Sequence, residues 1–447
     1  MENQAPVTVP APDPDALYAE HLESELARYS EALEACDHDA LVIAAGEPAH
    51  HFLDDIEASF KANPHFRLFV PLDATAGSQL VLRPGYKPVL LHLRPQDFWH
   101  LPPAPAAGAW TDGFDVREVE SPEALARALR DVLAGANHAA HIAPDEPVPT
   151  ELLARLDFGR GRKTAYEIAC MANANARAAK GHRAARDAFL AGESEYGIHM
   201  AYLLASSQED AGLPYGNIVA LNTHAAVLHY QHRERRPPAD GHHSFLIDAG
   251  ASERGYAADV TRTYSAAPGP FADLIEAMDQ AQLALAAQVR PGLDFVDLHR
   301  AAHLAVARIL TDSGLAEGTP EALLEKGVTS TFLPHGLGHL IGVQTHDVGG
   351  RLTGPDGSLR PPPEDFPALR LTRTLEADFV VTIEPGLYFI PMLLDELRSR
   401  PEGRQVNWQA VEALMPFGGI RIEDDVRVTA SGCDNLTRPA LAAEGLR

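Results

Sequence analysis

Residues 243–265 read HSFLIDAGASERGYAADVTRTYS, and this stretch predicts a β-hairpin, because two β-prone runs flank the turn-forming letters ASERG. With Ser252–Gly255 as the turn, Asp248 and Asp259 stand directly opposite each other on paired strands. Directly opposed like charges destabilise a sheet. Both strands are otherwise apolar, so we expect the two aspartates to face a buried layer, where a cation between them would turn repulsion into attraction. The alternatives are one exposed aspartate, or a register displaced by one residue, which would place them on opposite faces.

Two glutamates occupy similar positions further along the chain. Glu384 ends the apolar run DFVVTIEPG, and Glu423 shares one face of the run GGIRIEDDVRV with Arg421 and Asp425, by the two-residue period of a strand. Burying an unpaired carboxylate is expensive. Each acid alone could cap a turn or pair with an arginine. Taken together with nearby histidines, four acids on β segments predict a metal site rich in oxygen ligands.

The histidines lie in residues 335–350, which read HGLGHLIGVQTHDVGG and contain His335, His339 and His346. The spacing of the first two resembles a helical zinc motif, but that motif needs a glutamate after the first histidine. The two glycines between them would each cost a helix about 1 kcal/mol relative to alanine. A strand or an extended loop fits better, with glycines that let the backbone pass close to a ligand. The spacing leaves open which histidine is the ligand.

Composition excludes several classes of function. With 62 acidic and 37 basic side chains, the net charge of −25 repels phosphate backbones, so we expect no nucleic-acid partner. The three cysteines, Cys36, Cys170 and Cys433, lack the spacing of a disulfide framework or a zinc site. The opening residues carry prolines and acids where a signal peptide needs a basic end and an apolar run. No apolar stretch is long enough to cross a membrane, so we expect a cytoplasmic protein with no membrane partner.

The order of predicted elements indicates an α+β fold in two parts. Helices at 14–35 and 121–135 surround β-like runs, which predicts a small α/β domain over residues 1–160. Residues 161–447 combine long helices with glycine-punctuated strands. The β-like runs of the first part are 40–46, 66–72, 79–85 and 87–93, and those of the second are 217–222, 226–231, 243–250, 256–265, 378–389 and 418–428. Long helices are expected between 164 and 206 and between 271 and 315.

Four segments resemble, in order, the metal-site motifs of the pita-bread metallopeptidases: DAGASERGYAADVTRTY, HGLGHLIGVQTHDVGG, TIEPGLYF and GGIRIEDDV. Four further segments resemble the bacterial prolidases (Xaa-Pro dipeptidases), a subgroup that includes the organophosphorus acid anhydrolases: PYGNIVALN, VLHY, LRLTR and MPFGGIRIED. The resemblance covers most of 160–430 closely and the N-terminal part more loosely. It implies a pita-bread catalytic domain over 161–447 and an N-terminal domain that takes part in dimerisation and covers the pocket.

This resemblance implies a site for two divalent metal ions and selects the middle histidine as a ligand. Asp259 and Glu423 would bridge the ions, with Asp248 on one ion and His339 and Glu384 on the other. Because four of the five ligands are hard carboxylates, manganese is the metal expected, with zinc and cobalt as alternatives.

The resemblance also implies a lining for the substrate pocket. His335, His346 and His229 of VLHY would face the substrate, together with Tyr215 of PYGN. The alternative for each histidine is a packed, hydrogen-bonded place in the core. Position 345 is Thr345, where relatives are expected to carry valine, and a hydroxyl changes what a packed pocket accepts.

Two arginines and a tryptophan complete the expected site. Arg370 and Arg421 resemble the arginines near the substrate's carboxylate, although Arg421 could instead neutralise the acids and Arg370 could be a surface residue. Trp99 of DFWH resembles a tryptophan that reaches the active site from the other subunit of a homodimer. Its alternative is a hydrophobic contact within the first domain.

The activity that the resemblance implies is hydrolysis of Xaa-Pro dipeptides. A hydroxide bridging the two metal ions would attack the amide carbonyl, Glu384 would carry the proton to the proline nitrogen, and His229 and His346 would hydrogen-bond the oxyanion. An aminopeptidase that releases the residue before proline from longer peptides is the alternative, and hydrolysis of organophosphate triesters is a plausible side activity. A non-catalytic binding protein of the same fold would lack metal ligands, and none is missing here.

Overall fold

The computed structural model describes residues 13–143 and 148–447, so the opening residues that argue against a signal peptide lie outside the described part. The N-terminal part is built on a mixed five-stranded sheet of order β4-β3-β2-β1-β5. The parallel pairs are β1 with β5 and β3 with β4, and β2 runs antiparallel to both of its neighbours. The strands are β1 (Ala40–Ala44), β2 (Gln79–Leu82), β3 (Val89–Leu93), β4 (Asp115–Val119) and β5 (Ala139–Ile142).

The helices of this part begin at strong local signals. In α1 (Pro14–Ala35), Asp13 caps the first turn by accepting from the backbone N–H of Asp15 at 3.0 Å, and the predicted helix over 14–35 is confirmed. Ser121 caps α3 (Pro122–Val132) by accepting from the backbone N–H of Ala124 at 3.2 Å, which confirms the second predicted helix. The other helices here are α2 (Pro64–Arg67) and α4 (Thr150–Gly159), with a 3₁₀ turn at Ala109–Gly113.

One predicted strand of this part is wrong. The run at 66–72 forms α2 and an irregular segment instead of a strand, because Pro64 stands at the first helical position. Asn63 caps that turn by accepting from the backbone N–H of His65 at 3.0 Å. A proline with a capping residue before it outweighs the β-prone letters that follow.

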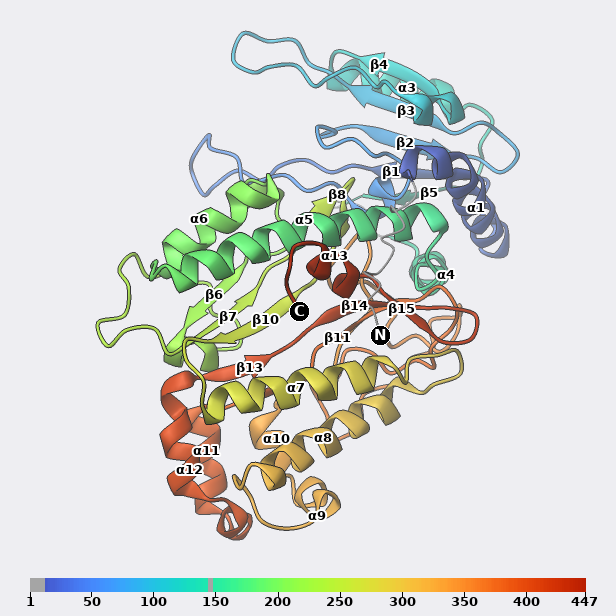
Figure 1. The fold of residues 1–447 in the computed structure, drawn as a ribbon. Helices are drawn as coiled ribbons and strands as arrows, with labels where there is room; N and C mark the ends of the chain where they lie inside the picture. Colours follow the sequence, from blue (N-terminus) through green and yellow to red (C-terminus); the bar gives the residue numbers. More distant parts are fainter. Residues whose placement is uncertain (1–12, 144–147) are drawn as a thin grey trace, which may run out of the picture.

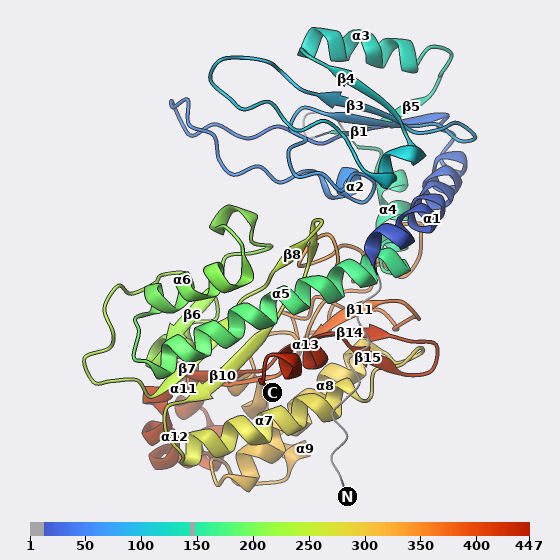
Figure 2. The ribbon, with the colours of Figure 1, turned by 45° about the horizontal axis from the view of Figure 1, so that its top comes forward.

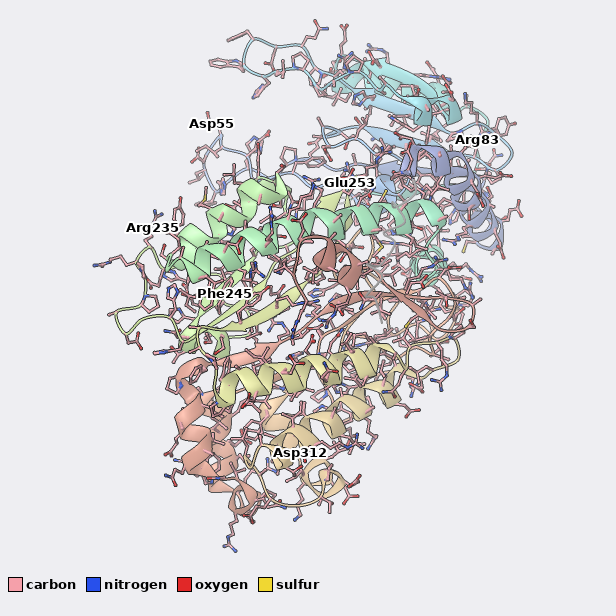
Figure 3. All side chains as sticks on the ribbon, viewed as in Figure 1. Asp55, Arg83, Arg235, Phe245, Glu253 and Asp312 are labelled. Carbon is pink, nitrogen blue, oxygen red and sulfur yellow. The ribbon has the colours of Figure 1, made fainter. Side chains whose placement is uncertain are left out.

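The C-terminal part places small sheets between two pairs of helices (Figure 1). A capping box of Thr164 and Glu167 starts α5 (Ala165–Leu190). This helix and α6 (Glu195–Ser206) lie on one side of the sheets, where Phe245 packs beneath them in a shared buried cluster (Figure 3). On the other side lie α7 (Pro270–Ala286) and α8 (Phe295–Asp312). The shorter helices are α9 (Pro320–Glu325), α10 (Val328–Phe332), α11 (Pro391–Ser399), α12 (Trp408–Leu414) and α13 (Thr437–Ala443).

The sheets of the C-terminal part are short and adjoin one another. One has the order β10-β7-β6, a second has the order β11-β14-β15, and β12-β13 and β8-β9 form two-stranded ribbons. The run at 226–231 is a 3₁₀ turn and a loop, so that predicted strand is wrong. The strands are β6 (Ile218–Leu221), β7 (Ser244–Asp248), β8 (Ser252–Glu253), β9 (Tyr256–Ala257), β10 (Thr261–Ser265), β11 (Val380–Ile383), β12 (Gly386–Tyr388), β13 (Gly419–Arg421), β14 (Asp424–Val428) and β15 (Cys433–Asn435).

The hairpin at 243–265 exists, but its register differs from the predicted one. Asp248 pairs with Thr261 instead of Asp259, because the chain reverses at Arg254 and Gly255, whose φ angles are 51° and 88°. Two residues with positive φ make a tight turn one position later than predicted. The displacement is two residues, so the two aspartates keep the same side of the ribbon and stand diagonally.

The N-terminal part lies over one end of the C-terminal part, and a shared core joins them (Figure 2). Tyr18 and Tyr29 of α1 belong to the same buried cluster as Tyr166 and Met171 of α5 and Tyr256 of the hairpin. The two parts therefore share a hydrophobic contact, and their arrangement fixes the shape of the cavity between them. Within the described ranges no helix is long and apolar enough to cross a membrane, and all three cysteines are free.

The hairpin turn supplies a test of this contact. A Cβ on Gly255 would lie 2.2 Å from Nε of Arg67, which belongs to the N-terminal part, whereas a Cβ on Gly292, with a similar φ of 83°, would meet nothing within 4 Å. Alanine at either site costs about 1–2 kcal/mol for the left-handed backbone. We expect Gly255→Ala to lower the unfolding free energy by more than Gly292→Ala in urea titrations. Equal losses would contradict the close contact.

Candidate metal centre and active site

A cavity of about 1170 Å³ collects every predicted site residue except Trp99. The floor comes from the C-terminal part, and one wall comes from Lys61, Asn63 and Arg67 of the N-terminal part. Lys61 donates to the carbonyls of Leu213 and Pro214 at 2.6 and 3.0 Å, so this wall is attached next to the segment that carries Tyr215. The predicted residues that line the cavity are Tyr215, His229, Asp248, Asp259, His335, His339, His346, Arg370, Glu384, Arg421 and Glu423.

The four acids meet because strand ends and breaks converge. Asp248 is the last residue of β7, and Asp259 lies in the gap between β9 and β10. Glu384 follows β11, and Glu423 occupies the break between β13 and β14, where a bridge pairs it with Thr261. A strand break lets the chain turn a side chain into the cavity, which an uninterrupted strand would hold on a fixed face.

His339 is held in the form that a metal ligand requires. Its Nδ1–H donates to the carbonyl of Leu340 at 3.0 Å, so Nε2 carries the lone pair. That Nε2 lies 3.6 Å from an oxygen of Asp259 and 3.8 Å from an oxygen of Glu384. The extended loop predicted for 335–350 is confirmed, and a Cβ on Gly338 would lie 2.0 Å from the carbonyl oxygen of Thr382. The glycine therefore brings His339 against β11.

The donor atoms fit a divalent cation. One ligand atom each of Asp259, His339 and Glu423 lies within 4.8 Å of the others, and all three residues are buried. Asp248 adds a carboxylate oxygen, Oδ1, that is buried without a hydrogen-bond partner among the described residues. A buried unpaired carboxylate oxygen is costly unless a cation or donor reaches it. Carboxylate oxygens with one imidazole suit divalent metals of the manganese and zinc type.

The electrostatics point the same way. Burial, and then the charge of Asp248, raises the pKa of Asp259 well above its usual value. Burial, and then the charge of Asp259, does the same to the pKa of Glu423. Burial raises the pKa of Glu384 to about 8 even though Arg421 opposes the shift. Burial, with His346 next in effect, lowers the pKa of His339 to about 3, so its imidazole is neutral. Bound cations would stabilise the ionised carboxylates that burial disfavours.

Arg421 lies in the cavity wall but is engaged with the protein. Its Nη2 donates to Oδ2 of Asp248 at 2.7 Å, and its Nη1 donates to the hydroxyl of Tyr388 at 2.8 Å. It is 5 % exposed. This geometry favours the alternative weighed from the sequence, in which Arg421 neutralises the acidic site, over direct binding of a substrate carboxylate. Strand alternation does direct it to the same cavity as Glu423.

His335 is also engaged on both ring nitrogens. Its Nδ1–H donates to the carbonyl of Gly336 at 2.8 Å, and its Nε2 accepts from the Tyr388 hydroxyl at 2.8 Å. The Tyr388 hydroxyl in turn accepts from Arg421, so each hydrogen bond in this series has a fixed donor and acceptor. His335 therefore offers a substrate its ring face and shape, and no free nitrogen.

Several cavity groups are free to meet a substrate. His229, His346 and Arg370 are exposed to the cavity, and the His346 ring stands at 90° to that of His339 with centroids 4.5 Å apart. Oγ1 of Thr345 is buried without a hydrogen-bond partner in the described structure, whereas the buried Tyr215 hydroxyl lies beside Asp259 and lowers the pKa of that carboxyl.

Three residues that support the site were not predicted from the sequence as part of it. Thr261 donates its hydroxyl to Glu423 at 2.7 Å, and Asp425 accepts from the backbone N–H of Asp259 at 3.1 Å. Asn175 of α5 donates to Asp425 at 2.8 Å. The shared strand face of Glu423 and Asp425 was the only available signal for Asp425. Nothing in the local sequence of α5 connects Asn175 with a strand 250 residues later.

A second buried group of potential ligands, His21, Glu25 and Glu167, lies between α1 and α5. Both ring nitrogens of His21 are engaged, with the hydroxyl of Thr164 and the carbonyl of Leu68, each at 2.8 Å. Glu25 binds Arg28 at 2.8 Å. The hydrogen bonds occupy the atoms that a metal would need, so we assign this cluster to the contact between the two parts.

Trp99 lies outside the cavity of its own chain. It stands in the long loop between β3 and β4, is 76 % exposed and contacts Phe98, with ring centroids 4.6 Å apart. The contact with Phe98 is the hydrophobic contact within the first domain that was the alternative, and the reach of Trp99 to a second subunit stays a prediction. An exposed tryptophan on a projecting loop is available to a second molecule.

Comparisons with known proteins agree with this arrangement. Residues 169–430 match the model of metallopeptidase family M24, and residues 16–158 match that of the Xaa-Pro dipeptidase N-terminal domain. The chain is 46 % identical over 443 residues to an Xaa-Pro dipeptidase of Xanthomonas euvesicatoria, covering 97 % of this chain and 100 % of the relative. It is 45 % identical over 439 residues to an Xaa-Pro dipeptidase of Stenotrophomonas maltophilia, covering 96 % and 98 %.

Similar solved structures establish the fold. A variant of Escherichia coli aminopeptidase P superposes with a TM-score of 0.69 at 21 % identity, covering 94 % of this chain and 98 % of that one. An aminopeptidase of Pseudomonas aeruginosa gives a TM-score of 0.65 at 22 % identity, covering 98 % and 100 %. Both likenesses confirm the predicted α+β class, with a pita-bread catalytic part after an N-terminal domain. The chain therefore belongs to metallopeptidase family M24, in the branch that carries the Xaa-Pro dipeptidase N-terminal domain.

Proposed function

We propose that this protein is an Xaa-Pro dipeptidase that hydrolyses its substrate at a centre of two divalent metal ions. The observation that carries the proposal is the convergence of four carboxylates and the unprotonated Nε2 of His339 in one cavity of a chain related to Xaa-Pro dipeptidases along its whole length. When bound, a metal pair supplies an activated water and stabilises charge that develops during hydrolysis.

Asp248, Asp259, His339, Glu384 and Glu423 would hold the metal ions, which would supply the activated water. The ligand atoms of Asp259, His339 and Glu423, which lie within 4.8 Å of one another, support this assignment. Manganese suits this set, because four of the five ligands are carboxylates. Thr261 and Arg421 orient the ligands by holding Glu423 and Asp248 at 2.7 Å each.

The remaining roles follow from which groups are free. Glu384 is the proposed proton carrier toward the proline nitrogen, because its carboxylate lines the cavity with one oxygen 3.8 Å from Nε2 of His339, next to the proposed metal ions. His346, whose pKa burial lowers, is neutral and can donate an N–H to the carbonyl oxygen. His229 faces the same cavity and is proposed to share this role.

Arg370 is proposed to bind the free carboxylate of the dipeptide. It lines the cavity and is exposed to it, while Arg421 is occupied by Asp248. An arginine fork matches a carboxylate with two parallel hydrogen bonds. A cavity that holds the C-terminal carboxylate and is walled by the N-terminal part at Lys61 and Arg67 favours dipeptides over longer peptides. We place the division between the two domains at residues 160/161, in line with the two matched family models.

We further propose a cytoplasmic homodimer. Two long loops of the N-terminal sheet project on one side, and Asp55 is labelled on the first of them (Figures 1 and 3). Three free cysteines suit a reducing compartment. The exposed apolar residues on these loops are Phe52, Leu53, Ile56, Phe98, Trp99 and Leu101.

The substrate class can be tested with Ala-Pro, Gly-Pro and Ala-Pro-Gly and manganese-loaded protein. We expect cleavage of the dipeptides, and we expect Asp259→Asn to lose more than the roughly 100-fold that removal of an outer-shell partner costs. Asp13→Asn is the control, because asparagine replaces aspartate as the cap of α1 at little cost. Cleavage of the tripeptide alone would indicate the aminopeptidase and remove the carboxylate role of Arg370.

The raised pKa of Glu384 predicts how metal-free and metal-loaded protein respond to pH. A carboxyl whose pKa rises from 4.5 to about 8 on folding stabilises the fold below the lower value and loses that contribution as pH rises through the upper one. We expect the Tm of metal-free protein to fall between about pH 4.5 and about pH 8, while manganese affinity rises over the same range as protons are released. Glu384→Gln should flatten both curves. A metal-free Tm that rises with pH would refute this account.

The dimer can be tested by sedimentation. Placing a carboxylate in an apolar interface costs several kcal/mol, so Leu101→Asp is expected to shift the protein toward monomers. Leu359→Asp is the matched control, since Leu359 is 68 % exposed and Leu101 is 93 % exposed. An equal response of both variants, or of neither, would argue against an interface at these loops.

A further inference from the structure

A buried ion triad stands directly behind the catalytic loop. Asp347 follows His346 in the sequence, and its two carboxylate oxygens bind Nη2 of Arg160 at 2.5 Å and Nζ of Lys163 at 2.6 Å. The three side chains are 1–3 % exposed. Both cations come from the connection between α4 and α5, where the N-terminal part joins the C-terminal part. The triad therefore links the domain connection to a residue that adjoins the active site.

The triad anchors both ends of the loop between His339 and His346. Asp347 donates its backbone N–H to the carbonyl of Leu340 at 2.8 Å, which closes the loop, and Arg160 also donates to the side chain of Gln344 at 2.9 Å. A Cβ on Gly342 would lie 2.5 Å from Asp347 Oδ2 and 2.9 Å from Lys163 Nζ. The glycine leaves room for the ion pair inside the loop.

Polar contacts also lie on the N-terminal side of the triad. Asp157 of α4 lies 3.3 Å from Nε2 of His65, whose Nδ1 accepts from the Tyr29 hydroxyl at 2.7 Å. Through Arg160, the residue that follows α4, the triad connects the end of that helix with the loop that carries His346. Buried charges rarely add stability compared with apolar residues of similar size. We therefore explain this buried network by the position that it gives to the His346 loop, and not by a gain in folding stability.

We propose that Asp347, held by Arg160 and Lys163, is a positioning residue that fixes His346 over the metal centre. The inference rests on the proposed function, in which His346 donates a hydrogen bond to the substrate carbonyl. His346 itself has no hydrogen-bond partner among the described side chains that would set its orientation, apart from its ring contact with His339. The backbone therefore sets the position of His346, and the ion pairs of Asp347 with Arg160 and Lys163 hold that backbone at the next residue.

The test is a double-mutant cycle. We expect Asp347→Asn to lower kcat by about 10- to 100-fold, as loss of an outer-shell partner does, with KM little changed and with two metal ions still bound. In a His346→Ala background, Asp347→Asn should add less than about threefold, because residues that act through one another are not additive. Hydrogen exchange of residues 340–348 should accelerate in Asp347→Asn, with and without metal.

Two further variants keep the test decisive. Lys163→Met removes one cation and leaves the Asp347–Arg160 pair, so it replaces Asp347→Asn in the cycle if that variant does not fold. We expect it to give the same non-additive pattern with His346→Ala. Leu82→Ala, a core truncation in the N-terminal sheet, is the stability control and should lower Tm without lowering kcat. Full additivity of Asp347→Asn with His346→Ala, unchanged exchange of 340–348, or loss of metal would overturn the inference. A wild-type protein that binds metal and cleaves none of the peptides would instead refute the proposed function.

Discussion

Repulsion among buried carboxylates is the constraint on which the catalytic part depends. Asp248, Asp259, Glu384 and Glu423 share one cavity, and burial and mutual charge hold the pKa values of Asp259 and Glu423 well above their usual range. The protein offsets part of the repulsion with the guanidinium of Arg421. The hydroxyl of Thr261 donates a further hydrogen bond to Glu423. Protons relieve the remainder in metal-free protein, and bound cations would replace those protons and stabilise the ionised carboxylates.

The architecture around the acids serves their placement. Strand ends and breaks, instead of strand interiors, carry all four acids, and His339 comes from a glycine-rich loop pressed against β11. The tautomer of His339 is set by one backbone carbonyl, and that of His335 by Gly336 and Tyr388. Histidines that look alike in the sequence thus differ in function, because the partner of one ring nitrogen decides what the other can do.

The N-terminal part contributes more than a lid. It shares a hydrophobic core with α5, supplies a wall of the cavity and reaches the His346 loop through Arg160, Lys163 and Asp347. A substrate in the cavity would contact elements whose positions depend on both parts. The relation of the two parts is therefore a property of the active site as well as of the fold.

The sequence by itself determined the class of fold, the helices at 14–35 and 121–135, and the list of residues that gather in the cavity, because periodicity, caps and ordered motifs are local signals. It misplaced the hairpin register, since a turn at Arg254 and Gly255 cannot be told from one at Ser252–Gly255 without the backbone angles. It also read strands at 66–72 and 226–231 that do not form. The engagement of Arg421 with Asp248, and the support from Asn175 and from the Asp347 triad, were decided by tertiary structure alone. These contacts join residues more than a hundred positions apart, and no local pattern encodes which distant side chain a buried charge will meet.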